Sequence, residues 1–215
     1  MTKLYLSKQP SRRQLLQLAM GVAGMGVMGT VLTACSNAGP TYYTLTSIPG
    51  KVYLQSPTVI EVRSPSLAGF LDKDRIVSEI SNNQLTISAA AAWGENLATM
   101  MGRVIMLDLA QRLPNSRVFL QNQATQTTPQ AYVEIDVSRF NQDVAGKAVV
   151  TADLVIRARE DRSARFSRLL TLEKEPANSS IQALVVALSQ ILGEIADIAA
   201  ANLTNLPILS SALSK

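Results

Sequence analysis

Alternation of apolar and polar side chains is clearest in the carboxyl-terminal half of the chain, where it predicts three strands. Apolar residues recur at every second position in residues 132–140 and 148–159, and again in 165–173 after a turn at 161–163. A period of two places one face of a strand on a core and the other in water. Because the connections are short, we expect an antiparallel meander.

Shorter segments rich in β-favouring residues precede this meander. Two early strands are expected at residues 42–46 and 58–62. Residues 75–80 and 84–88 flank Asn82 and Asn83. This arrangement predicts a hairpin, because asparagine tolerates the positive φ that a tight turn requires.

Two longer segments show the period of amphipathic helices. Residues 89–113 carry apolar side chains at spacings of four and three, and Pro114 ends this run before a short strand at 117–120. Residues 180–203 have an unbroken apolar stripe with polar side chains elsewhere on the wheel. Such stripes predict helices that pack on a core.

Together these elements predict a single α+β domain at residues 42–203. Its sheet is expected to be mixed and mostly antiparallel, with two long helices packed on one face, because each amphipathic helix buries its apolar stripe against the sheet. Residues 204–215 contain Pro207 and several serines. We expect them to form a flexible C-terminal tail.

The first 34 residues have the pattern of an export signal. Basic side chains come first, an apolar run at 15–34 follows, and Leu32 and Ala34 stand before the only cysteine, Cys35. This ending resembles the lipobox of bacterial lipoproteins. The resemblance implies that the Cys35 thiol carries a diacylglyceryl group, that the chain is cut before it, and that the new amino terminus takes a further acyl chain such as palmitate. The alternative is a transmembrane anchor, which the run is long enough to form although glycines dilute it.

The export route and the destination have their own signals. Arg12 and Arg13 lie in a segment that resembles a twin-arginine motif, and an ordinary signal in which they supply positive charge is the alternative. Ser36 follows the cysteine in place of the aspartate that retains such proteins in the inner membrane. By that resemblance, residues 35–41 form a lipidated tether on the periplasmic face of the outer membrane of a Gram-negative bacterium.

The charge balance removes nucleic acid from the expected partners. Residues 1–34 contain four of the 20 basic residues and none of the 16 acidic ones, so the mature chain carries equal numbers of both. Histidine is absent, which removes the commonest general base and the commonest zinc ligand. We therefore expect no catalytic residues, no cofactor and no metal.

Two carboxylate pairs remain as candidates for a hydrolase. They are Asp72 with Asp74, and Glu134 with Asp136. The second pair shares a strand face by alternation, and a solvated polar face is the simpler interpretation. We expect the protein not to be an enzyme.

A basic run offers another candidate surface. It consists of Arg157, Arg159, Arg162, Arg165 and Arg168. One interpretation is that it binds a phospholipid headgroup or an acidic partner. The other is a solvated surface of mixed charge, because acidic residues lie close by in the sequence.

The loop at residues 64–74 is more apolar than a loop needs to be. Leu67, Phe70 and Leu71 are its apolar side chains. We interpret them as candidate partner contacts, with a plug over the core as the alternative.

Several motifs occur in an order that resembles one family. They are Tyr42-Tyr43-Thr44-Leu45 after the lipobox, residues 71–77 before the hairpin, Trp93-Gly94-Glu95-Asn96-Leu97, residues 134–140, and an alanine-rich helix at 183–201. This order is similar to that of the PqiC (YmbA) family of ABC-type transport auxiliary lipoproteins. Where that family has W-A-E-P-L, Asn96 replaces the proline.

The resemblance implies an accessory role in lipid transport between two membranes. The expected partners are an MCE-type periplasmic tunnel protein and its inner-membrane permease, and the expected membrane contact is the lipid anchor. A homo-oligomeric ring could continue such a tunnel. The alternative function is that of a structural or regulatory outer-membrane lipoprotein for envelope assembly, for example an activator of a cell-wall synthase.

Overall fold

Three long strands form the centre of the sheet in the computed structural model, which describes residues 39–81, 83–121, 127–159 and 164–206. They are β7 (Ala131–Gln142), β8 (Ala148–Ala158) and β9 (Ala164–Lys174). Both β7 with β8 and β8 with β9 pair antiparallel, so the predicted meander is confirmed. Every second side chain of β7 and β8 points toward the helices, and these side chains form the middle of the core.

Six shorter strands complete the nine-stranded mixed sheet of the described residues. They are β1 (Thr41–Tyr43), β2 (Val59–Val62), β3 (Ser66–Leu67), β4 (Arg75–Ser81), β5 (Gln84–Trp93) and β6 (Arg117–Leu120). Three of them, β2, β3 and β4, pair in turn along one edge of β7, and all three run parallel to it. The antiparallel β4–β5 hairpin, with β1 added in parallel to β5, extends the sheet at this end.

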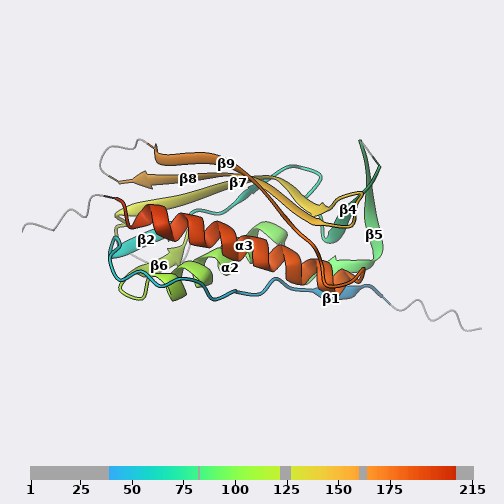
Figure 1. Cartoon of the computed structure of the whole chain (residues 1–215), viewed down its shortest axis with the longest axis horizontal. Coiled ribbons are helices and arrows are strands. Elements are labelled where there is room, and N and C mark those ends of the chain that lie inside the picture. The colour runs from blue at the N-terminus through green and yellow to red at the C-terminus, as the bar shows by residue number, and fades with distance from the viewer. Residues whose placement is uncertain (1–38, 82, 122–126, 160–163, 207–215) are drawn as a thin grey trace, which may run out of the picture. The chain divides into compact units, whose positions relative to one another are not determined.

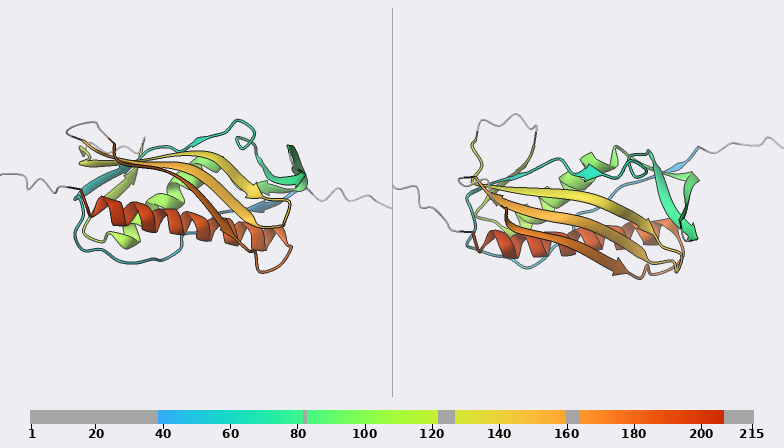
Figure 2. Two further views of the ribbon diagram at one scale, coloured as in Figure 1. Left: turned by 45° about the horizontal axis from the view of Figure 1, so that its top comes forward. Right: turned by 90° about the horizontal axis from the view of Figure 1, so that it is seen from above.

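Two helices among the described residues lie on one side of the sheet (Figures 1 and 2). They are α2 (Leu97–Arg112) and α3 (Ile181–Leu203). In Figure 2 the strands β7, β8 and β9 form a curved layer over α3, while α2 packs on β6, β2 and α3. The α+β class predicted from the sequence is therefore confirmed.

The helix α3 is long and apolar enough to cross a membrane by length and composition alone. However, 72% of its apolar window is buried within this domain. Its apolar stripe contacts β8, β9, β7 and α2. The helix is therefore a core element, as its predicted amphipathic pattern indicates.

The start of the first helix was predicted wrongly. Residues 89–93 were expected to be helical, but β5 continues to Trp93 and α2 begins only at Leu97. Alanine favours helices locally, but Ala91 and Ala92 pair with β1, and the Trp93 N–H donates to the carbonyl of Asp74 at 2.8 Å. These partners are distant in sequence, so local propensity could not reveal them.

Local sequence signals explain the ends of these elements. Asn83 has φ 65°, as the predicted asparagine turn requires, while Asn82 lies outside the described residues. Asn96 caps α2 by accepting a hydrogen bond from the Thr99 N–H at 3.2 Å, and Ser180 caps α3 in the same way. Asparagine therefore provides a cap at the position where the resembling family has proline.

An extended segment without regular structure crosses the helices between β1 and β2 (Figure 1). We call residues 44–58 the strap. Asp108 of α2 accepts hydrogen bonds from the Ser47 hydroxyl at 2.6 Å and from the Ile48 N–H at 2.7 Å. Arg112, also of α2, donates to the Ile48 carbonyl at 2.8 Å. The strap is therefore held to the helices by buried polar side chains.

Candidate partner surface and an arginine-lined pocket

The residues predicted to direct export and lipidation cannot be located in the fold. Cys35, Arg12, Arg13, Leu32 and Ala34 all lie outside the described residues. Their roles remain predictions from the sequence. The described part of the chain begins at residue 39, four positions after the cysteine.

The apolar loop before β4 is only partly available to a partner. Leu71 is 1% exposed and belongs to the core, and Leu67 is half-buried against it. Phe70 is 39% exposed. The alternative of a plug over the core thus describes Leu71, whereas Phe70 offers an aromatic side chain at the surface.

The β4–β5 hairpin presents an apolar surface that the sequence interpretation did not identify. Ile80, Leu85 and Ile87 are all substantially exposed, and Leu85 and Ile87 share one face of β5 by alternation. Figure 1 shows this hairpin projecting at the end of the sheet where β1 lies. The available signal was the alternation of Leu85 and Ile87 with polar residues within the strand predicted at residues 84–88.

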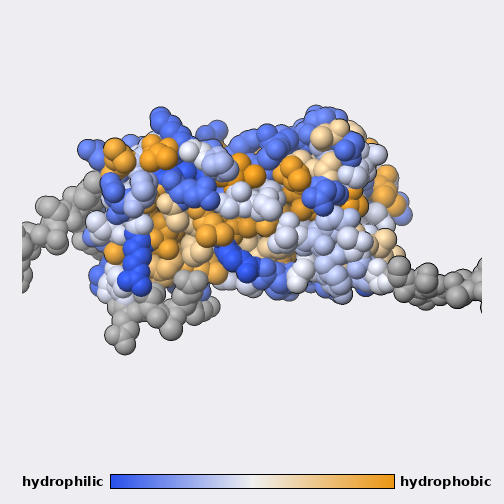
Figure 3. Space-filling model, turned by 90° about the horizontal axis from the view of Figure 1, so that it is seen from below, coloured by the Kyte–Doolittle hydropathy of each residue, from blue (hydrophilic) through white to orange (hydrophobic). Residues whose placement is uncertain are grey.

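The side of the molecule occupied by α2 and the strap has a different surface. Figure 3 shows hydrophilic residues interrupting the apolar ones across this side. Leu107, on α2, is 41% exposed. Scattered apolar side chains of this kind are normal on protein surfaces, so they do not by themselves indicate a partner.

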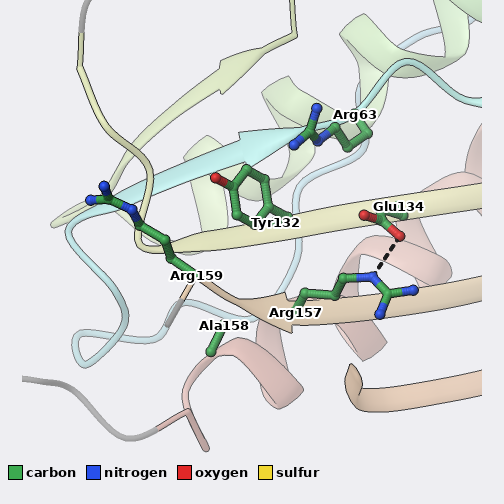
Figure 4. A pocket seen from close by; sticks show the side chains of 6 residues that line it. All are labelled: Arg63, Tyr132, Glu134, Arg157, Ala158 and Arg159. Atoms are coloured by element: carbon green, nitrogen blue, oxygen red, sulfur yellow. Dashed lines mark hydrogen bonds and ion pairs between the residues drawn. The ribbon is translucent and has the colours of Figure 1, made fainter. Parts of the chain in front are cut away.

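A polar pocket of about 430 Å³ lies on the face of the sheet opposite the helices. Its charged or polar lining side chains are Arg63, Tyr132, Glu134, Arg157 and Arg159. Tyr132 and Glu134 come from β7 and Arg157 from β8, while Arg63 and Arg159 directly follow the last residues of β2 and β8. In Figure 4 the three arginines lie around the Tyr132 ring.

The three arginines of this pocket differ in how they are held. The Arg63 guanidinium carbon lies 4.6 Å from the centre of the Tyr132 ring, a cation–π contact. The Arg157 Nε donates to Glu134 Oε2 at 2.9 Å. The Arg159 side chain is exposed, and its guanidinium forms no hydrogen bond or ion pair with the described residues. Arg157 therefore fits the mixed-charge interpretation, while the Arg159 guanidinium is exposed to solvent.

A second hollow continues along the same face and has the opposite charge. It is lined by Arg63 and Glu134 together with Asp136 and Asp153, which are directly opposite each other on β7 and β8. Glu134 and Asp136 do share the solvated face, as alternation predicted. Of the other carboxylate pair, Asp72 accepts a hydrogen bond from Asn96 at 3.2 Å. In the described ranges no group of three or more histidine, cysteine or acidic residues is placed to hold a metal ion.

Comparisons with known proteins give one family. The family model for the ABC-type transport auxiliary lipoprotein component matches residues 43–200, which include β2 to β9, all of α2 and all but the last three residues of α3. A search of curated proteins gave no match.

Solved structures with a similar fold are distant in sequence. Protein XCC0632 from Xanthomonas campestris is 20% identical, with a TM-score of 0.65, over 77% of this chain and 96% of its own. An uncharacterised protein is 16% identical, with a TM-score of 0.60, over 73% of this chain and 97% of its own. At such identities, the likeness shows the fold alone.

Proposed function

This chain belongs to the ABC-type transport auxiliary lipoprotein family, and from that premise we propose that it is the membrane-anchored accessory protein of an inter-membrane lipid transport system. The observation that carries this proposal is the family match across residues 43–200. An accessory of this kind needs an anchor, a stable platform and a docking surface, and it needs no catalytic residue. The rigid sheet and the two core helices provide the platform.

The proposed location is the periplasmic face of the outer membrane. Support comes from the lipobox-like sequence that ends at Cys35 and from Ser36 in the following position. A diacylglyceryl group together with a second acyl chain holds a protein stably at a bilayer. The domain would then act at the end of a short lipidated tether.

The proposed partner is an MCE-type tunnel protein whose far end is an inner-membrane permease. Phe70 is the residue of the predicted contact loop that remains exposed, and it is the natural place to probe this interaction. An aromatic anchor at the surface is typical of binding hot spots. Leu67 and Leu71 would support the loop from below.

A closed ring of identical subunits is part of the same proposal. The outer edge of β9 pairs with no strand of the described residues, and Leu169 on it is 67% exposed. An open edge invites pairing with another chain. A head-to-tail contact that closes on itself would produce a ring able to extend a tunnel.

Site-specific photo-cross-linking in the living cell tests the partner. A photoreactive amino acid at Phe70 should form adducts with the tunnel protein, whereas one at Leu107, a similarly exposed residue of α2, serves as the matched control. Adducts with a cell-wall synthase instead would favour the envelope-assembly alternative. Identical adducts from both positions would show only that the tunnel protein is nearby, and would contradict a specific contact at Phe70.

A further inference from the structure

The outer part of the β4–β5 hairpin lacks the protection that strands in water normally have. The two charged residues of the hairpin, Arg75 and Glu79, both lie in β4 before this part and pair with Asp74 and Arg139. Residues 80–93 contain no charged side chain, although 17% of the whole chain is charged. Within this run Ile80 and Ile87 are each 54% exposed and Leu85 is 43% exposed. Natural edge strands carry proline, lysine or other charged residues, which block association with another strand. The composition of this hairpin indicates that its surface is covered when the protein works.

The backbone of the hairpin limits what can cover it. On the outer side of β5, β1 pairs only with Ala91–Trp93, so residues 84–90 have no strand partner there among the described residues. Unpaired N–H and C=O groups cannot enter the hydrocarbon core of a bilayer. They can lie at its interfacial level, where water and lipid headgroups accept and donate hydrogen bonds.

The length of the tether places the hairpin near a bilayer. Thr41, the first residue of β1, follows Cys35 by six residues, which span at most about 20 Å even when fully extended. Thr41 pairs directly with Ala91 at the base of the hairpin, and neighbouring strands lie about 5 Å apart. An acyl group on Cys35 therefore holds the base of the hairpin within about 25 Å of the bilayer surface.

We propose that the β4–β5 hairpin lies on the lipid surface, with Leu85 and Ile87, which share a face of β5, and Ile80, which lies at the β4 bulge beside them, in the interfacial region of the bilayer. This inference rests on the part of the proposed function that attaches lipid to Cys35. Because the tether makes the contact intramolecular, a small apolar surface suffices to hold it. The contact fixes the orientation of the domain relative to the membrane, so Phe70 and the edge of β9 face a defined direction.

A depth measurement on the complete lipoprotein tests this contact. Cys35 is the only cysteine, so in the acylated lipoprotein a cysteine introduced elsewhere is the single free thiol. Leu85→Cys carries a spin label on the hairpin, and Leu107→Cys carries the same label on α2 as a matched control. Each protein is reconstituted as one copy in nanodiscs of phosphatidylethanolamine and phosphatidylglycerol.

The measured quantity is the ratio of the label's accessibility to oxygen to its accessibility to a water-soluble nickel chelate. We expect this ratio to be several-fold higher for the label at position 85 than for the label at position 107. Replacing Ile80→Ser and Ile87→Ser in the Leu85→Cys protein should remove this difference. Trp93 is buried at the base of the hairpin, so its fluorescence reports whether the variants remain folded.

Two results would overturn the proposal. One is a label at position 85 that stays as accessible to the nickel chelate as the control. The other is protection that appears only when several copies share a membrane, which would assign the surface to a second copy of the chain.

The nanodiscs contain no transport partner, so failure of the photo-cross-linking experiment leaves this measurement unaffected. The mass of the amino-terminal residue is determined first. A mature protein without acyl groups on Cys35 would end both the location proposed above and this inference, whereas an acylated protein with a solvated hairpin would end only the inference.

Discussion

Arg112 Nε lies 2.7 Å from Asp197 Oδ1 and joins α2 to α3 beneath the strap, although the arginine side chain is completely buried. Its other donors reach the carbonyl oxygens of Ile48, Asp108 and Gly193 at 2.8 to 3.0 Å. A buried cation is tolerated only when its donors are satisfied in this way. One side chain thus holds together both helices and the strap.

Replacing Arg112 should be among the most destabilising single changes in the domain. Arg112→Met leaves the three carbonyl oxygens and Asp197 without their donor, and we expect a loss of about 3–5 kcal/mol in the free energy of unfolding. Urea denaturation followed by circular dichroism measures it. Arg103→Met, which breaks a surface pair with Glu95, is the control and should cost less than about 1 kcal/mol. Equal stability of the two variants would refute the structural role of Arg112.

Asp108 should make stability depend on pH. Burial raises the pKa of Asp108 above its ordinary value of 3.8, although hydrogen bonds from Ser47 and Ile48 oppose this. The folded state then keeps its proton to a higher pH than the unfolded state does. The stabilisation is therefore full below the ordinary pKa and is lost as pH rises through the raised value.

The matched variant isolates this effect from the other carboxylates. Asp108→Asn cannot ionise and keeps the oxygen that accepts from the strap. Denaturant titrations over acidic to neutral pH should show the free energy of the natural protein falling relative to that of the variant as pH rises. A constant difference across this range would mean that Asp108 does not titrate with a raised pKa.

Gly193 should resist substitution because α3 and the strap approach closely there. A Cβ at this position would lie 2.9 Å from the Ile48 Cβ, closer than side-chain atoms tolerate. Gly193→Ala should therefore displace the strap and cost about 1–3 kcal/mol in thermal unfolding experiments. Gly69→Ala, which meets nothing within 4 Å, is the control and should leave stability unchanged or slightly higher.

Asn96 should matter for the start of α2. Asn96→Ala removes the acceptor for the Thr99 N–H and the donor to Asp72, so we expect a loss of about 1 kcal/mol. Asn96→Ser restores a capping oxygen and should recover much of that loss. Chemical denaturation compares the three proteins. If serine behaved like alanine, the contribution of Asn96 would come from Asp72 instead of from capping.

Cys35→Ser tests the anchor. Without a thiol to acylate, the chain should remain unprocessed and carry no diacylglyceryl mass. It should also lose the proposed lipid attachment to the membrane. Mass spectrometry of the amino-terminal peptide and membrane fractionation check these outcomes, with Ser36→Ala as a control that keeps the acylated sulfur. Processing and acyl content identical to the natural protein would contradict lipidation at this residue.

The spacing of apolar residues correctly predicted those elements in which buried side chains recur at a fixed interval along the chain. The meander and α3 have periods of two and 3.6, and their buried faces agree with those periods. The run of alanines before Trp93 has no such contrast, and there the helical interpretation was wrong. Arg112 and Asp108 could not be recognised as buried, because a charged residue late in a helix ordinarily points to water.

The order of residues alone therefore determined the α+β class, the antiparallel meander and the predicted lipid attachment, because each depends on neighbours within a few positions. It also determined the family resemblance, which depends on the order of several such short motifs along the chain. Only the tertiary structure decided which distant segments meet. It pairs β1 with the end of β5 and places Arg112 under the strap. It also places the Arg63 guanidinium over the Tyr132 ring, in the pocket that Arg159 lines. These contacts join segments that are far apart in sequence. Their partners are selected by packing and by the need to satisfy buried polar groups, and no local period records that selection.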